Sequence, residues 1–279
     1  MTMPTNDTDL PALNWTEKSK IVYIAFSKHQ FYLRSHISAY VLSAGHTPIS
    51  PFMNFDYNLG DLVERQAIRI ANNSLLHASD ELWVFGPVSD GVLVEIYQAM
   101  RRKVPVRYFD LSKRVEIREI SPDDVQLEDV SDWMWQMVLT GQNLERWHPR
   151  LRFYKSYPIV YPAYSKHNFF WQMHISKYCL DHKMVPLNPF MLFRYFLGDM
   201  VPREVVYRAN NTIVQSADAI WVFGDIADGV LAEIKLARMT GRPVQYFAIT
   251  QKNPVEFRRV ASDRMQFELP DLERYRSEL

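Results

Sequence analysis

The chain has 279 residues, and its 32 basic and 32 acidic residues cancel to a formal net charge of zero at pH 7. A neutral chain gives no global electrostatic reason to bind nucleic acid, so we expect no nucleic-acid partner. No run of about 18 apolar residues occurs, so we expect no membrane span. Cys179 is the only cysteine, which excludes an intrachain disulfide and fits a reducing cytoplasm. Residues 1–13 lack the basic and apolar regions of a signal peptide, and we expect a loose tail and a cytoplasmic location.

The sequence contains two copies of one unit. Residues 21–109 align with residues 159–247 without a gap, at a constant offset of 138. A period of this length indicates a duplicated domain rather than a solenoid. We expect one repeat over residues 15–130, a tryptophan-containing connecting helical segment over residues 131–154, and a second repeat over residues 155–279.

Each copy alternates strand and helix patterns in chain order. In the first copy the expected strands are Ile21–Phe26, Thr47–Ser50, Leu82–Phe85 and Val104–Phe109, with a further edge strand over Val115–Ile120. The expected helices are His29–Ala44, Asp61–His77 and one that begins near Gly91. Strands that alternate with helices predict an α/β fold with a parallel, doubly wound sheet in each copy.

The segment Asp90-Gly91-x-x-x-Glu95 follows a buried strand, and Asp228-Gly229-x-x-x-Glu233 repeats it. Ligands of α/β proteins bind where a strand ends in a loop that opens a helix. A carboxylate near the positive helix end is favoured in its ionised form, and an ionised Glu can act as nucleophile in glycosyl transfer. The alternative is an acidic residue that lies near a helix N-terminus and has no catalytic role.

Polar residues also follow the first strand of each copy, as Ser27-Lys28-His29 and Ser165-Lys166-His167. Hydroxyl, ammonium and imidazole groups at a helix N-terminus predict an anion site, and we expect a 5′-phosphate. The alternative for Ser27 is a plain N-cap.

Two further features repeat. Asn72 and Asn210 begin Asn-Asn pairs late in the second helix, where Asn is a poor helix former, so we expect ligand contacts or a helix-end cap. The aromatic loop from Pro51 to Tyr57 could stack a base or belong to the core. No Cys/His cluster, phosphate-binding Walker loop or G-x-G-x-x-G occurs, and we expect no metal and no cofactor.

On these residues the chain resembles the nucleoside 2-deoxyribosyltransferase-like superfamily, which includes nucleotide N-glycosidases. The resemblance rests on Tyr23 and Tyr161 in the first strands, on the strands that follow Asp80 and Asp218, and on the Asp-Gly-x-x-x-Glu turns.

The resemblance implies flavodoxin-like, Rossmann-like domains, and we expect a pseudo-twofold pair within one chain. A further homo-oligomer stays open from the sequence. It also implies that Glu95 and Glu233 attack the anomeric carbon, each in a pocket walled by its copy's tyrosine and Asn72 or Asn210. Where the family usually has an Asp, this chain has these two asparagines, which cannot serve as general acids.

Three functions remain open from the sequence. The first is cleavage or transfer of the N-glycosidic bond of a small-molecule nucleotide or nucleoside. The second is a nucleotide-binding or sensor module without chemistry, which the asparagines favour. The third is hydrolysis of a dinucleotide such as NAD by the same carboxylate chemistry.

Overall fold

The computed structural model describes residues 10–56, 59, 62–111, 116–152, 155–252 and 254–279. Tyr57, Asp61 and Val115, at the edges of expected elements, lie outside this part of the chain. The described residues form two compact units. We call residues 20–157 the N-terminal domain, and residues 158–279 together with residues 10–19 the C-terminal domain.

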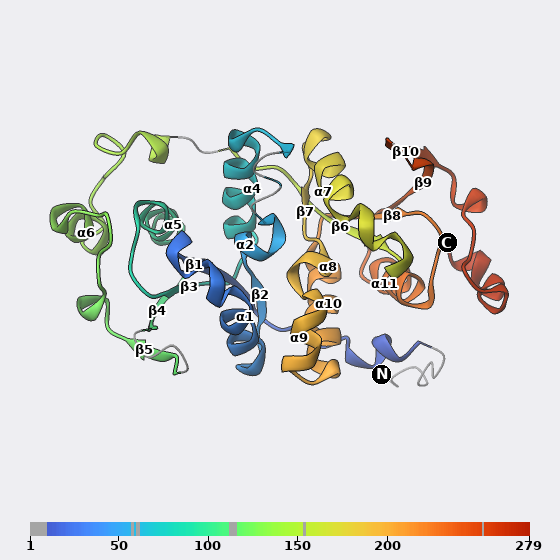
Figure 1. The fold of residues 1–279 in the computed structure, drawn as a ribbon, viewed down its shortest axis with the longest axis horizontal. Helices are drawn as coiled ribbons and strands as arrows, with labels where there is room; N and C mark the ends of the chain where they lie inside the picture. The colour runs from blue at the N-terminus through green and yellow to red at the C-terminus, as the bar shows by residue number, and fades with distance from the viewer. Residues whose placement is uncertain (1–9, 57–58, 60–61, 112–115, 153–154, 253) are drawn as a thin grey trace. The chain divides into compact units, whose positions relative to one another are not determined.

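Each domain contains one five-stranded sheet, and the two sheets have the same strand order (Figure 1). The order is β2-β1-β3-β4-β5 in the N-terminal domain and β7-β6-β8-β9-β10 in the C-terminal domain. Four strands of each sheet are parallel, and the last is antiparallel to its neighbour. This is the flavodoxin-like order, so the predicted tandem flavodoxin-like folds are confirmed. The strands are β1 Ile21–Phe26, β2 Thr47–Ile49, β3 Glu81–Phe85, β4 Val106–Asp110, β5 Arg118–Ile120, β6 Ile159–Tyr164, β7 Val185–Pro186, β8 Ala219–Phe223, β9 Val244–Lys252 and β10 Val255–Val260.

The helices between the strands also correspond between the domains. The N-terminal domain has η2 Lys28–Leu33, α1 Arg34–Ser43, α2 Pro51–Asn54, α4 Arg65–His77, α5 Asp90–Arg101, η3 Pro122–Asp124, α6 Asp132–Leu139 and η4 Pro149–Arg152. The C-terminal domain has η1 Pro11–Trp15, η5 Lys166–Trp171, α7 Gln172–Asp181, α8 Pro189–Leu192, α9 Arg194–Met200, α10 Arg203–Ser216, α11 Asp228–Met239, η6 Ser262–Arg264 and η7 Pro270–Glu278. The segment expected as one helix from His29 begins as the 3-10 helix η2, and the expected aromatic loop contains the short helix α2.

Side chains of β1 alternate between the two faces of the sheet. Val22, Ile24 and Phe26 join a core cluster with Ile37 of α1. Because neighbouring side chains in a strand point to opposite faces, Tyr23 lies on the other face. Helix α5 packs against β1, β3 and β4, and Figure 1 shows α1 and α5 on opposite sides of this sheet. Strand β1 therefore presents Tyr23 to the helix that carries Glu95.

The segment that precedes β1 packs in the C-terminal domain. The Asn211 side-chain amide on α10 donates to the carbonyls of Ala12 and Trp15, at 2.7 and 3.0 Å. The Ser19 backbone N–H donates to the Thr212 hydroxyl at 3.1 Å. Residues 10–19 therefore belong structurally to the domain that holds the second repeat.

The segment that precedes β6 packs in the N-terminal domain in the same way. The Asn73 side-chain amide on α4 donates to the Lys155 carbonyl at 3.5 Å, and the Tyr157 N–H donates to the Ser74 hydroxyl at 2.8 Å. Asn73 and Asn211 occupy equivalent positions, so the second asparagine of each pair anchors a strand-leading segment.

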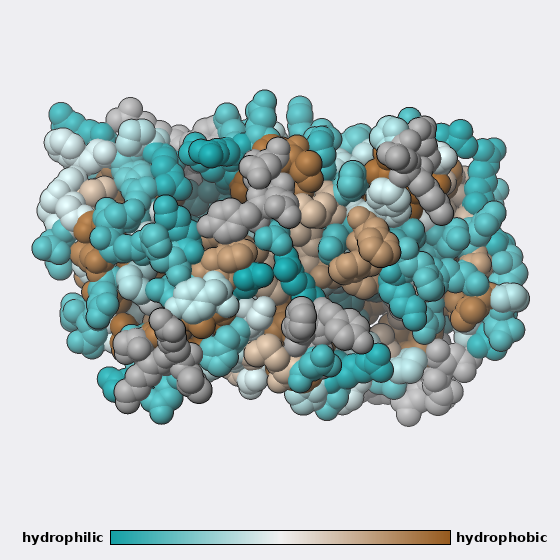
Figure 2. Space-filling model, in the orientation of Figure 1, coloured by the Kyte–Doolittle hydropathy of each residue, from teal (hydrophilic) through white to brown (hydrophobic). Residues whose placement is uncertain are grey.

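Within the described residues, no helix is both long and apolar enough to cross a membrane. Hydrophilic side chains cover most of the face seen in Figure 2, and apolar side chains appear there in small groups.

Candidate functional site

A cleft of about 760 Å³ opens in the N-terminal domain beside the carboxyl end of β1. Helices α4 and α5 supply one part of its wall, and Phe52 and Phe55 of the aromatic segment supply another. The carboxyl end of a parallel sheet is where α/β proteins bind ligands. The cleft is lined by six of the residues singled out from the sequence, Ser27, Lys28, Asn72, Asp90, Gly91 and Glu95.

Glu95 is held by a buried tyrosine. The Tyr23 hydroxyl donates to Glu95 Oε1 at 2.7 Å, and the Tyr23 side chain is fully buried. Burial raises the pKa of Glu95 to about 7, although the Tyr23 hydrogen bond and the Arg150 charge lower it. Burial, together with the Glu95 charge, raises the pKa of Tyr23 well above its usual value. Tyr23 therefore remains a hydrogen-bond donor to a carboxyl that gains or loses its proton near neutral pH.

The structure corrects the expectation that the helix end keeps Glu95 and Glu233 ionised. Each is the sixth residue of its helix, and the field of a helix end falls off within the first turn. Burial dominates instead and raises the pKa of both carboxyls to about 7. Each carboxyl therefore gains or loses its proton in the neutral pH range.

Asp90 is held by two residues from the connecting segment. His148 Nε2 lies 2.6 Å from Asp90 Oδ1, and Arg150 Nη1 donates to Asp90 Oδ2 at 2.6 Å. Burial raises the pKa of Asp90, but the hydrogen bonds and charges of His148 and Arg150 outweigh it and bring the pKa below its usual value. Arg150 also lines the cleft. Asp90 is thus an ionised anchor that holds a guanidinium beside Glu95.

His148 and Arg150 are site residues that the sequence did not predict. They lie more than fifty residues from Asp90, in a segment outside the aligned copies. Extending the offset of 138 places them opposite Leu10 and Ala12. The two segments pack alike but carry different residues at these positions. That sequence difference is the signal that could have identified His148 and Arg150.

The Ser-Lys-His segment of the first copy is only partly in the cleft. Ser27 Oγ accepts a hydrogen bond from the His29 N–H at 3.3 Å, so Ser27 is the N-cap of η2, as the alternative interpretation expected. Lys28 lines the cleft, whereas His29 Nε2 lies 3.1 Å from Glu128 Oε1. The anion site at these residues stays a prediction.

In the C-terminal domain the corresponding polar groups bond to one another. Tyr161 donates to Asn210 Oδ1 at 2.9 Å and also lies in hydrogen-bond contact with Glu233 Oε1. Asn210 Nδ2 donates to the same Glu233 oxygen at 3.1 Å. Burial raises the pKa of Glu233 to about 7, opposed by these two hydrogen bonds. Asn210 therefore satisfies Tyr161 and Glu233 at the same time.

Ser165, Asp228 and Gly229 of the second copy make contacts within their own segments, whereas His167 Nε2 lies 3.9 Å from Glu268 Oε2. Ser165 Oγ accepts from the His167 N–H at 3.2 Å and caps η5, which begins at Lys166. Asp228 Oδ1 accepts from the Gly229 N–H at 2.8 Å, within the start of α11.

The glycine that the strand-to-helix turn requires is the one at the strand end. Gly86 and Gly224 follow β3 and β8 with φ values of 74° and 72°, which favour glycine. Gly91 and Gly229 of the Asp-Gly-x-x-x-Glu segments lie inside helices α5 and α11 without a positive φ. The tight turn therefore comes four residues before Asp90 and Asp228.

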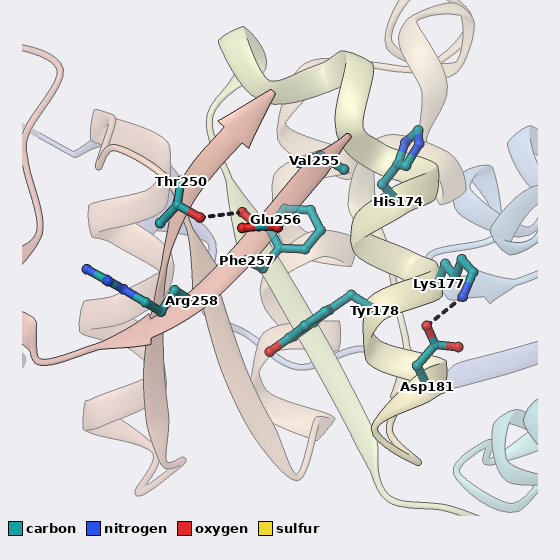
Figure 3. A pocket seen from close by; sticks show the side chains of 9 residues that line it. All are labelled: His174, Lys177, Tyr178, Asp181, Thr250, Val255, Glu256, Phe257 and Arg258. Carbon is teal, nitrogen blue, oxygen red and sulfur yellow. Dashed lines mark hydrogen bonds and ion pairs between the residues drawn. The ribbon is translucent and has the colours of Figure 1, made fainter. Parts of the chain in front are cut away.

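A second hollow, of about 700 Å³, lies between α7 and the β9–β10 hairpin (Figure 3). Its walls carry a Lys177–Asp181 ion pair at 2.6 Å and the side chains of Tyr178 and Phe257. None of the residues singled out from the sequence lines it. Across the described residues, no group of three or more His, Cys, Asp and Glu side chains is placed to hold a metal ion.

A family model described as a domain of unknown function, DUF7768, matches residues 26–109 and again residues 161–247. No curated protein and no solved structure matches the chain. The two matched segments coincide with the two sequence repeats and together cover more than half of the chain. The chain therefore belongs to the DUF7768 family and carries its domain twice.

Proposed function

We propose that the chain cleaves or transfers the N-glycosidic bond of a nucleoside or nucleotide, with Glu95 as the nucleophile. One observation carries the proposal, namely that a carboxyl hydrogen-bonded to the buried Tyr23 lines a cleft at the ligand-binding edge of a parallel sheet. A carboxylate in that position can trap an oxocarbenium-like sugar as a covalent ester.

The reaction proceeds in two steps. A Glu95 oxygen bonds to the anomeric carbon, the carbon–nitrogen bond breaks, and the base leaves with the electron pair and takes up a proton from solvent. Water, or a second base, then bonds to the same carbon, the ester bond to Glu95 breaks with its electron pair returning to the carboxylate, and the proton of the attacking group passes to solvent. Tyr23 fixes the carboxyl in orientation, because its hydroxyl holds Oε1. Asn72 can hydrogen-bond the substrate but cannot supply the proton.

Lys28 supports a phosphate on the substrate. Lys28 comes just after β1 in the chain and lines the cleft, and its ammonium is a compact positive charge. Lys28→Ala should weaken binding of a nucleotide more than binding of the matching nucleoside. The effect of Lys166→Ala, the equivalent change in the second copy, on the same two ligands is the comparison. Equal effects of Lys28→Ala on both ligands contradict the phosphate assignment.

The second candidate is a nucleotide-binding module without chemistry. The observation that favours it is Asn210, which bonds to both Tyr161 and Glu233 and, as an amide, cannot serve as a general acid. Under this function the protein binds nucleotides and releases no base.

The test is incubation with a panel of nucleosides, nucleotides and NAD, with free base followed by chromatography. We expect base release by the parent and a loss of at least about a thousandfold in Glu95→Gln. Glu119→Gln, which changes an exposed carboxylate paired with Arg107, is the control and should keep the parent's rate. Binding without base release from any compound favours the binding module instead.

A further inference from the structure

Gln98 is a buried amide on the cleft side of α5 without a partner for its donor group. It lies one helical turn after Glu95, is 3% exposed and lines the cleft. Its Nε2 has no hydrogen-bond partner among the described residues. Buried polar groups in folded proteins are nearly always paired, so an unpaired amide on a cleft wall points to a partner that arrives with a ligand.

Asn72 presents a complementary group in the same cleft. Its Oδ1 is buried and has no hydrogen-bond partner in the described part of the chain. Helices α4 and α5 pack together and carry Asn72 and Gln98, respectively. The cleft wall beside Glu95 therefore offers one unpaired acceptor and one unpaired donor.

At the equivalent positions the C-terminal domain has neither the unpaired acceptor nor the unpaired donor. The residue equivalent to Gln98 is Leu236, which is 2% exposed and apolar. The residue equivalent to Asn72 is Asn210, whose amide already bonds to Tyr161 and Glu233. Two equivalent sites thus differ in whether their polar groups still need partners.

We propose that Gln98 and Asn72 bind a polar group of the ligand beside Glu95, so that the N-terminal domain alone is the ligand site. The inference rests on the proposed function and names the recognition chemistry of that site. The ligand group both accepts and donates hydrogen bonds. A sugar hydroxyl and the amide-like edge of a nucleobase share this chemistry.

The experiment is titration calorimetry of the full chain with three probes, adenosine 5′-monophosphate, ribose 5-phosphate and adenine. We expect one binding event per chain for the nucleotide. Binding of ribose 5-phosphate that depends on Gln98 assigns the group to a sugar hydroxyl, and binding of adenine that depends on Gln98 assigns it to the base.

The deciding variant is Gln98→Leu, which installs the side chain found at the equivalent position of the second copy. We expect nucleotide binding to weaken by about tenfold or more, because the ligand group loses its partner in the cleft. The melting temperature should stay the same or rise, because an unpaired amide leaves a buried position. Asn72→Ala should weaken binding similarly, whereas the exposed Gln136→Leu should not.

Separate results overturn the inference and the proposed function. Unchanged nucleotide binding in Gln98→Leu, or a lower melting temperature of this variant, overturns the inference alone. Two binding events per chain also contradict it. A parent that binds none of the probes overturns both.

Discussion

The Glu95 carboxyl has a pKa of about 7, so modest changes around it alter how much of it is ionised near neutral pH. Burial raises this pKa, and the Tyr23 hydrogen bond is the first of the two contacts that lower it. A nucleophile must be ionised to attack, so under the proposed function the rate should rise with pH through this pKa.

The first prediction concerns Tyr23→Phe, which deletes the hydroxyl and keeps the buried ring. Loss of the hydrogen bond to ionised Glu95 should raise the pKa of Glu95 further. The acid limb of kcat/KM against pH should therefore move to higher pH, with a smaller change in the rate at its alkaline plateau. The measurement is base release across the pH range. An acid limb that stays in place, or moves to lower pH, contradicts the assignment of Tyr23.

The second prediction concerns stability. The pKa of Glu95 is higher in the folded chain than its usual 4.5, so the folded state favours the protonated form. The stability associated with that proton is present below about pH 4.5 and is lost as pH rises through about 7. Glu95→Gln has no such loss and should be more stable than the parent at pH 8, by up to about 3 kcal/mol, but not at pH 4.5.

Hydrogen exchange of N-terminal-domain peptides at both pH values measures this difference. Glu119→Gln is again the control, because the Arg107 hydrogen bond lowers the pKa of Glu119 and the sign reverses. If the difference in stability between the parent and Glu95→Gln is the same at both pH values, the raised pKa of Glu95 is contradicted.

At the scale of elements, β1 and η4 bring the site together from distant parts of the chain. The continuous apolar run Ile21–Phe26 predicts a central strand, and β1 pairs with β2 and β3 on its two sides. The alternation of that strand places Tyr23 near α5. In contrast, η2 begins as a 3-10 helix that Ser27 caps through the His29 N–H, and the hydrophobic pattern does not reveal this local geometry.

The third prediction tests η4 through Arg150. Arg150→Ala removes a positive charge that lowers the pKa of Glu95, and it leaves Asp90 bound to His148 alone. The pKa of Glu95 should rise, and the acid limb of the pH profile should move to higher pH. Arg150→Lys keeps the charge but loses the planar guanidinium, so it should restore most of the acid limb. Equal pH profiles of Arg150→Ala and the parent would exclude this electrostatic role.

At the scale of the whole molecule, duplication is the strongest signal in the sequence, and it predicts two like-folded domains that the structure confirms. The segment before each first strand was harder to place, because Asn211 and Ala12 meet across almost two hundred residues. The same limit applies to Arg150 and Asp90. The sequence gives no sign of a role for Gln98, because a single amide is common in a helix pattern and only its neighbours in the fold show that it is unpaired.

The fourth prediction follows from residues 10–19. Deleting residues 1–19 leaves Asn211, Thr212 and Gln215 without the hydrogen bonds they make to this segment. Unpaired amides and lost packing should destabilise the C-terminal domain by a few kcal/mol. The N-terminal domain should keep its protection in hydrogen exchange. Equal loss of protection in both domains would contradict the assignment of this segment to one domain.

A nucleophilic Glu95 must become covalently bonded to the sugar during turnover. A substrate that the parent turns over is mixed with the parent or with Glu95→Gln, quenched in acid, digested and measured by mass spectrometry. We expect a sugar-sized mass increase on the parent peptide that holds Glu95, and neither the increase nor base release in Glu95→Gln. A sugar adduct on another residue, or base release by Glu95→Gln at the parent's rate, would contradict it.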